Sequence, residues 1–272
     1  MAASRRGFGL AAAVAPEVIR GAAQLAEELG YHSFWLNDND QGDGLEGLAQ
    51  AASVTSRIML GVGVIALSRK PAGQIVEHLR QLDGSQGGDA RLPLDRLWLG
   101  VGSGAGGKGA LERVRDGLET LNREANTTVF ISALGPRMSR LAGESAAGVL
   151  FNWLTPEFSE TANGWVRQAA ERANRPAPVL ASYVRVSLGP DGAKRMASEA
   201  ARYNGVPSYG DHFRRMGIEP VSAGIRGDTA DDIRRALASW EGLLDEIVVR
   251  SITAHDTLEE TLALVRAGAP EQ

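Results

Sequence analysis

The pattern of apolar and polar positions alternates between two periods along the chain. Short apolar runs with strand character are followed by stretches in which apolar residues recur every three or four positions, as on one face of a helix. Ile58–Ala66 is apolar without polar alternation, which predicts a strand buried on both faces. After Leu97–Val101 comes one helical stripe of four aliphatic residues: Leu111, Val114, Leu118 and Leu121.

Eight segments have strand character. They are Phe8–Leu10, Ser33–Leu36, Ile58–Ala66, Leu97–Val101, Thr128–Ser132, Val149–Asn152, Pro178–Val186 and Glu246–Arg250. Helices are expected from Pro16 and Pro71, over Leu45–Val54 and Met138–Ala147, and at the end of the chain around Leu258, Leu262 and Val265. The longest irregular stretch, Asn204–Asp228, is expected to carry one more helix around Tyr209–Met216.

This alternation predicts an α/β protein with the (β/α)8 barrel fold. The chain has 272 residues, and its linkers are too short to separate domains. We therefore expect residues 1–272 to form a single barrel domain. In such barrels the loops that follow the strands build the active site, so those loops hold the candidate functional residues.

Composition narrows the function further. The formal net charge is −4 and like charges do not cluster, which argues against a nucleic-acid or membrane partner. The chain has no cysteine, which excludes disulfides and thiol chemistry. Pro16 and Glu17 soon interrupt the stretch after Arg5 and Arg6, so we expect no signal peptide and a cytoplasmic location.

The glycine run after the fourth expected strand satisfies the pattern G-x-G-x-x-G with Gly102, Gly104 and Gly107. A dinucleotide-binding fingerprint belongs to the first strand–helix turn of its fold, whereas three strands precede this one. The run is therefore interpreted as one wall of a barrel site, and Lys108 as a solvated residue.

The residues at the strand ends are mainly amides, hydroxyls and a few arginines. No lysine lies in or just after a strand, which argues against Schiff-base chemistry. Carboxylates cluster only after the second strand, and the four histidines lack metal-ligand spacing, so no metal site is expected. Such a site suits a bound cofactor that carries the chemistry itself.

Several longer motifs carry a family resemblance. They are EELGYHSFWL (27–36), SVTSRIMLG (53–61), RLWLGVGSG (96–104), ALGPRMSRLAG (133–143) and GVLFNWLTPE (148–157). In this order they resemble the luciferase-like monooxygenase superfamily, particularly its branch that uses the deazaflavin coenzyme F420. The resemblance implies a bacterial luciferase-like barrel, here with a shortened segment between the fourth and fifth strands.

The resemblance also implies roles for particular residues. Asp38 and Asn39 are the expected catalytic residues near the reacting ring edge. Gly63–Val64 matches a bulge that carries a non-proline cis peptide in related enzymes. The expected cofactor contacts are Gly63, Val64, Gly102, Ser103, Gly104, Ser132, Ala133, Leu134, Gly135, Pro136 and Asn152. Trp153 either lines the pocket or belongs to the core, and Arg185 and Arg250 either contact an anionic tail or form ion pairs at the rim.

The expected function is that of an oxidoreductase, transferring hydride between F420 and a small organic substrate. Two alternatives remain: an FMN-dependent monooxygenase or reductase of the same superfamily, and a non-catalytic flavin- or deazaflavin-binding protein. The sugar-phosphate dehydrogenase branch is disfavoured, because Asn39 and Ala105 replace its His and Glu. The resemblance also implies a homodimer.

Overall fold

The computed structural model describes residues 4–83, 91–104 and 106–271. Its strands form a closed parallel barrel: β1 Arg5–Leu10, β2 Ser33–Leu36, β3 Met59–Ala66, β4 Leu97–Gly102, β5 Thr128–Ala133, β6 Gly148–Asn152, β7 Val179–Leu188 and β9 Glu246–Ser251. Each strand pairs with the next, and β9 joins β7 to β1. The predicted (β/α)8 fold is confirmed.

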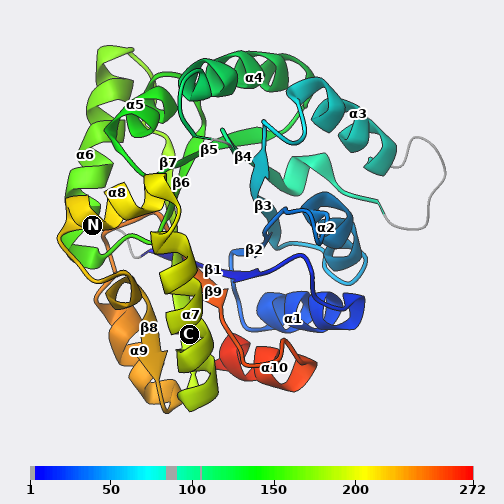
Figure 1. Cartoon of the computed structure of the whole chain (residues 1–272). Coiled ribbons are helices and arrows are strands. Elements are labelled where there is room, and N and C mark those ends of the chain that lie inside the picture. The colour runs from blue at the N-terminus through cyan, green and yellow to red at the C-terminus, as the bar shows by residue number, and fades with distance from the viewer. Residues whose placement is uncertain (1–3, 84–90, 105, 272) are drawn as a thin grey trace.

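Helices surround the barrel in chain order (Figure 1). They are α1 Pro16–Glu28, α2 Gly44–Ala52, α3 Ala72–Leu82, α4 Ala110–Glu124, α5 Pro136–Ser145, α6 Pro156–Arg172, α7 Gly189–Asn204, α8 Pro207–Met216, α9 Ala230–Ala238 and α10 Leu258–Ala267. α2 begins one residue and α5 two residues earlier than predicted, after the N-cap residues Asp43 and Gly135, and both helices end two residues earlier than predicted. The segment between β4 and β5 contains α4, and its predicted shortness is confirmed.

The stretch 204–228 is more regular than the sequence suggested. Besides the expected helix, α8, it contains a 3-10 turn over Pro220–Ala223 and a short strand, β8, over Ile225–Gly227. β8 pairs with the carboxyl end of β7, beyond the residues that pair with β6. Three residues give too short an apolar pattern to identify such a strand from sequence.

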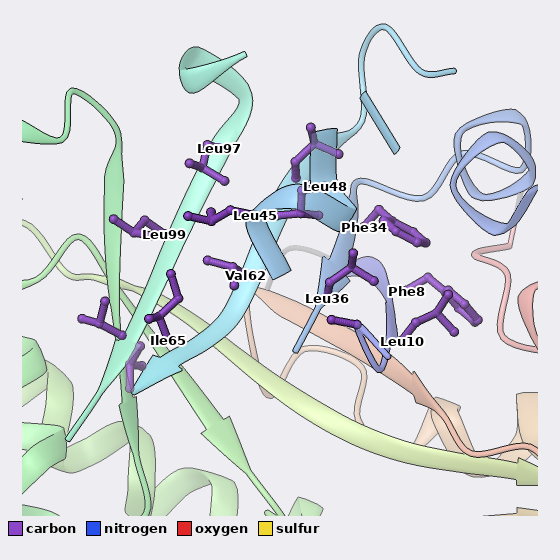
Figure 2. Packing of buried hydrophobic residues seen from close by; sticks show 14 of the residues in the cluster. Phe8, Leu10, Phe34, Leu36, Leu45, Leu48, Val62, Ile65, Leu97 and Leu99 are labelled. Atoms are coloured by element: carbon purple, nitrogen blue, oxygen red, sulfur yellow. The ribbon is translucent and has the colours of Figure 1, made fainter. Parts of the chain in front are cut away.

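The main hydrophobic core lies between the sheet and the helices. Figure 2 shows residues of β1 to β4 and α2 that meet in this layer, among them Phe8, Phe34, Leu36, Leu45 and Val62. All five are fully buried. Burial on this scale, at about 1.5–3 kcal/mol for each large side chain, is the main source of the barrel's stability.

A second cluster fills the barrel itself. Its buried members are Trp35, Trp98, Phe130, Leu150, Ala181, Tyr183 and Val248. A methyl group on Gly61 would stand 2.2 Å from a ring carbon of Trp35, so only glycine leaves room for the indole there. The barrel centre is thus a packed core.

Polar contacts at the amino ends of the strands link several of the stretches that carry the resemblance. Glu27 at the end of α1 accepts the backbone N–H groups of Arg57 and Ile58 at 2.7 and 2.8 Å. Arg96 donates to the Thr55 carbonyl at 3.0 Å and to its hydroxyl at 2.9 Å. Three of the stretches that carry the resemblance therefore stabilise the end of the barrel opposite to the expected site.

Candidate functional site

The alternation of side chains along each strand defines the carboxyl end of the barrel interior. Residues two positions beyond the aromatic layer face inward one step nearer the carboxyl end. These residues are Asn37, Gly102, Ser132, Asn152, Arg185 and Arg250, and Val64 of β3 joins them. We call this set the mouth residues. They place polar and small side chains directly above the aromatic layer.

The peptide bond between Gly63 and Val64 is cis, as the resemblance implied. The register of β3 against β4 shifts between Val62 and Ile65 around this bond. A methyl group on Gly63 would stand 2.3 Å from the Tyr183 hydroxyl, and the Val64 methyl groups approach Gly100 and Gly102. Two consecutive residues of β3 therefore face the barrel interior.

Val64, Gly102 and Ser132 meet on one side of the mouth. A methyl group on Gly102 would lie 3.1 Å from Ser132 Oγ and 3.2 Å from a Val64 methyl carbon. Val64 and Ser132 are only half-buried although they end interior rows of the barrel. The expected contacts from β3, β4 and β5 are thus brought together as a small, mostly apolar surface that carries one hydroxyl.

The loop from β5 to α5 divides its expected contacts between two faces. Ala133 is buried against the helices rather than at the mouth. Gly135 caps α5 without a side-chain hydrogen bond, and Pro136 is the first helical residue. Arg215 of α8 donates to the Leu134 carbonyl at 3.3 Å, and its guanidinium lies beside Gly135. An open helix N-terminus next to a guanidinium favours an anion.

Ser103 and Gly104 continue the mouth on the β4 side. Arg113 donates to the Ser103 carbonyl at 3.3 Å, which ties the loop to α4. Gly104 has a φ of 70°, and a methyl group there would collide with the side chain of Ser68 in the preceding loop. The two loops therefore approach closely, and Lys108 beyond them is exposed, as predicted.

Asp38 and Asn39 do not share the inward orientation of Asn37. The Asp38 carboxylate accepts the backbone N–H of Gly44 at 3.0 Å and forms an ion pair with Arg69. The Asn39 side chain accepts the N–H groups of Gln41 and Gly42 within its own exposed turn. The side-chain oxygens of Asp38 and Asn39 thus stabilise loops beside the mouth. The mouth residue that follows β2 is Asn37, which was not among the site residues expected from the sequence.

A buried polar network occupies the other side of the mouth. Arg185 Nε donates to Glu199 Oε1 at 2.7 Å, and its Nη1 donates to Asn152 Oδ1 at 2.5 Å. The Asn152 amide nitrogen donates to the Tyr209 hydroxyl at 3.0 Å. Burial alone would raise the pKa of Glu199, but Arg185 and Arg250 hold it below its usual value. The ion pair with Glu199 bears out the rim alternative for Arg185.

Trp153 is part of a buried cluster between β6 and the helices α7 and α8. It is 1% exposed and packs with Ala200, Phe213 and Ala223. The guanidinium carbon of Arg185 lies 3.8 Å from the centroid of its ring. Trp153 therefore belongs to the core, which was one of the two alternatives. Glu199 and Tyr209, which contact the mouth residues Arg185 and Asn152, could be identified only from the fold.

Comparison with known proteins supports the predicted resemblance. Residues 1–108 match the family model of the luciferase-like monooxygenases. The chain is 28% identical over 235 residues to a 5,10-methylenetetrahydromethanopterin reductase of Methanolobus tindarius, which covers 74% of this chain and 71% of the relative. It is 32% identical over 91 residues to an N-acetyl-S-alkylcysteine monooxygenase of Bacillus subtilis (strain 168), covering 31% of this chain and 25% of the relative. The resemblance to the luciferase-like monooxygenases is confirmed.

Solved structures share the fold. An F420-dependent secondary alcohol dehydrogenase superposes with a TM-score of 0.74 at 11% identity, covering 97% of this chain and 98% of the other. The coenzyme F420-dependent tetrahydromethanopterin reductase from Methanopyrus kandleri gives 0.68 at 18% identity, covering 98% and 99%. The oxygenating constituent of a 3,6-diketocamphane monooxygenase of Pseudomonas putida, in complex with FMN, gives 0.66 at 15% identity, covering 99% of each. These structures therefore share the (β/α)8 barrel fold of this chain.

No helix in the described ranges of the chain has the length and apolar character needed to cross a bilayer. No group of three or more His, Asp or Glu side chains in those ranges is arranged to hold a metal ion.

Proposed function

We propose that this protein is an oxidoreductase that binds coenzyme F420 at the barrel mouth and transfers hydride to or from a small organic substrate. The observation that carries the proposal is the meeting of Val64, Gly102 and Ser132 above the aromatic layer. The relatives named above include F420-dependent and FMN-dependent oxidoreductases. A cytoplasmic homodimer formed by one domain of 272 residues remains a prediction.

The residues of the mouth fit a flat ring with an acidic tail. Val64 and Gly102 form a small apolar surface on the β3 and β4 side, against which a planar ring could pack. The uncapped N-terminus of α5 and the neighbouring Arg215 offer N–H groups and positive charge for a tail. When bound, the deazaflavin supplies the hydride acceptor or donor.

The chain's own residues have positioning roles in this proposal. Ser132 and Asn152 offer hydrogen bonds at the mouth, while Trp35 and Tyr183 close the barrel beneath it and exclude water. Asp38 remains the proposed acid–base residue, although its carboxylate holds the start of α2 and Arg69. A positioning role for Asp38 is the alternative that this geometry favours.

A binding titration with two matched glycine variants tests the proposal. Purified protein is titrated with F420 and, separately, with FMN, while cofactor fluorescence and absorbance are followed. We expect saturable F420 binding, and we expect Gly102→Val to weaken it at least tenfold because the added side chain enters the mouth. Gly106→Val is the control, since nothing lies within 4 Å of a methyl group at that exposed position.

The outcomes separate the alternatives. F420 binding together with hydride transfer to an added carbonyl compound, or from an added alcohol, supports the oxidoreductase. Preferential FMN binding favours the flavin-dependent alternative, and tight binding without any hydride exchange favours the non-catalytic one. Failure to bind either cofactor, or equal loss in both glycine variants, contradicts the proposed site.

A further inference from the structure

Arg250 is a buried cation without a carboxylate partner. It is 8% exposed, and among the described residues no carboxylate oxygen lies within ion-pair distance of it. Its Nε donates to Asn37 Oδ1 at 2.9 Å and its Nη1 donates to the Ser251 carbonyl. Both acceptors are neutral, and the carboxylate that acts on the charge of Arg250, Glu199, lies beyond ion-pair distance and is bonded to Arg185. An uncompensated buried charge is costly, and proteins seldom keep one without a use.

Arg185 adds a second cation to the same side of the mouth. Arg185 and Arg250 are register partners on the adjacent strands β7 and β9, and both face inward. Glu199 forms an ion pair with Arg185 and acts on Arg250 from a longer distance. Two guanidinium groups thus share one carboxylate, and an arginine remains charged at any pH that a folded protein tolerates. This side of the mouth carries an excess of positive charge.

Unused hydrogen-bond donors accompany this charge. Within the described chain, Arg185 and Arg250 donate through Nε and Nη1, so the Nη2 of each can still donate to a ligand. The Tyr183 hydroxyl, one interior position below Arg185, is buried and lacks a partner within the described chain. A buried hydroxyl normally has a hydrogen-bond partner.

The two arginines lie across the mouth from the Val64, Gly102 and Ser132 surface, while the Tyr183 hydroxyl lies beside Gly63 and Arg185 bonds Asn152. The Val64, Gly102 and Ser132 surface belongs to β3, β4 and β5, and the candidate tail site lies at α5. Arg185 and Arg250 belong to β7 and β9, on the opposite side of the closed barrel. A group held by the arginines would therefore face the proposed ring across the mouth, which is the position of a substrate.

We propose that Arg185, Arg250 and the Tyr183 hydroxyl bind an anionic group of the substrate, and that the substrate is a carboxylate. A carboxylate offers two oxygens with the spacing that a guanidinium recognises, and it cancels the excess charge. The identification of the ligand as the substrate rests on the proposed function, whereas the existence of an anion site does not rest on it. An anionic cofactor ring could also supply the negative charge, and the competition test below distinguishes it from a substrate.

Calorimetric titration of the cofactor-free protein with benzoate and with benzamide tests the anion site. The two probes share size and shape and differ in charge. We expect benzoate to bind and benzamide not to bind measurably at the same concentrations. Arg250→Gln should weaken benzoate binding about 10- to 100-fold, as expected for loss of a charge-assisted hydrogen bond. Arg234→Gln, at an exposed ion pair on α9, is the matched control and should leave binding unchanged.

A second variant keeps the test valid if Arg250→Gln fails to fold. Tyr183→Phe removes only a hydroxyl that contacts no described acceptor, so the barrel should fold normally. It should weaken benzoate binding about tenfold or more, because a hydroxyl that donates to an ionised carboxylate forms a charge-assisted hydrogen bond. Equal affinity for benzoate and benzamide, or unchanged benzoate affinity in both variants, overturns the proposal.

A competition arm identifies the source of the anion. The benzoate titration is repeated with F420 or FMN at saturation. Benzoate affinity within about twofold of the cofactor-free value supports a substrate site. Displacement of benzoate by the cofactor overturns the substrate site and shows that the arginines bind the cofactor. If neither cofactor binds, the proposed function fails while the benzoate result still decides the anion site.

Discussion

The guanidinium carbon of Arg185 lies 3.8 Å from the centroid of the Trp153 ring, and both side chains are almost completely buried. Arg185 is further fixed by Glu199 and Asn152. The contact joins an inward-facing residue of β7 to the cluster beneath α8. The mouth of the barrel and its helical cover are therefore one connected structure.

Replacing Arg185 by lysine should destabilise the protein although the charge is kept. An ammonium group cannot stack on Trp153 while it bonds Glu199 and Asn152, because it lacks the planar fork of donors. We expect the free energy of unfolding to fall by about 1–3 kcal/mol. Urea denaturation followed by tryptophan fluorescence measures it, with Arg202→Lys as the matched exposed control. A loss no larger than that of the control would contradict the contact's importance.

His212 on α8 should make stability depend on pH. Burial lowers the pKa of its ring, and Nε2 lies 3.1 Å from the Trp153 carbonyl, which suits a neutral donor. In the unfolded chain the histidine has a pKa of about 6.5, so between this pH and the lower folded-state pKa the unfolded chain binds a proton and the folded chain does not. The stabilisation is therefore complete above about pH 6.5 and is lost as the pH falls below it.

The pH dependence can be isolated by comparing two histidine variants. Relative to His212→Gln, the wild type should lose up to about 1.4 kcal/mol of unfolding free energy per pH unit below pH 6.5. Denaturation curves at pH 7.5 and 5.5 measure the difference. His255→Gln is the matched control at a site that is 73% exposed, and it should keep most of the wild-type dependence. Parallel behaviour of His212→Gln and wild type would refute the role of His212.

Two glycine-to-alanine substitutions, Gly61→Ala and Gly73→Ala, should change the free energy of unfolding in opposite directions. Gly61→Ala places a methyl group 2.2 Å from the Trp35 ring, which must then shift in a packed barrel, and we expect a loss of about 2–3 kcal/mol. Gly73→Ala adds a methyl group to α3 with nothing within 4 Å, and should stabilise by up to about 1 kcal/mol. Thermal unfolding of both variants measures this. A Gly61→Ala protein as stable as wild type would contradict the packing described.

Asp38 can be assigned by measuring stability and turnover together. Asp38→Asn keeps the size of the side chain but removes the charge that holds Arg69. If Asp38 is a positioning residue, the free energy of unfolding falls by about 1–3 kcal/mol and turnover falls with it. If it is a catalytic residue, turnover falls while stability and cofactor affinity are retained. Unchanged stability and turnover would exclude both roles.

The sequence predicted the barrel because each strand and helix carries its own periodicity. Ile58–Ala66 and the Leu111 to Leu121 stripe needed no knowledge of the rest of the chain. The strand ends Ser132 and Asn152 were found for the same reason. The short strand β8 was missed, since three residues carry no readable period.

The orientation of individual site residues was harder to predict. β2 is buried on both faces, so nothing in its pattern shows that Asn37 faces inward and Asp38 outward. A shift of one residue moves a side chain to the other face of a strand. Glu199 and Tyr209 reach the site from α7 and α8, and only the packing of those helices reveals them.

A crystal structure of the protein with F420 bound tests the central claim most directly. The account predicts ring density against the cis peptide Gly63–Val64, in contact with Val64 and Gly102, with the tail directed towards the N-terminus of α5. Density for the ring outside the barrel mouth, or a mouth that stays free of cofactor in protein that binds F420 in solution, would contradict it.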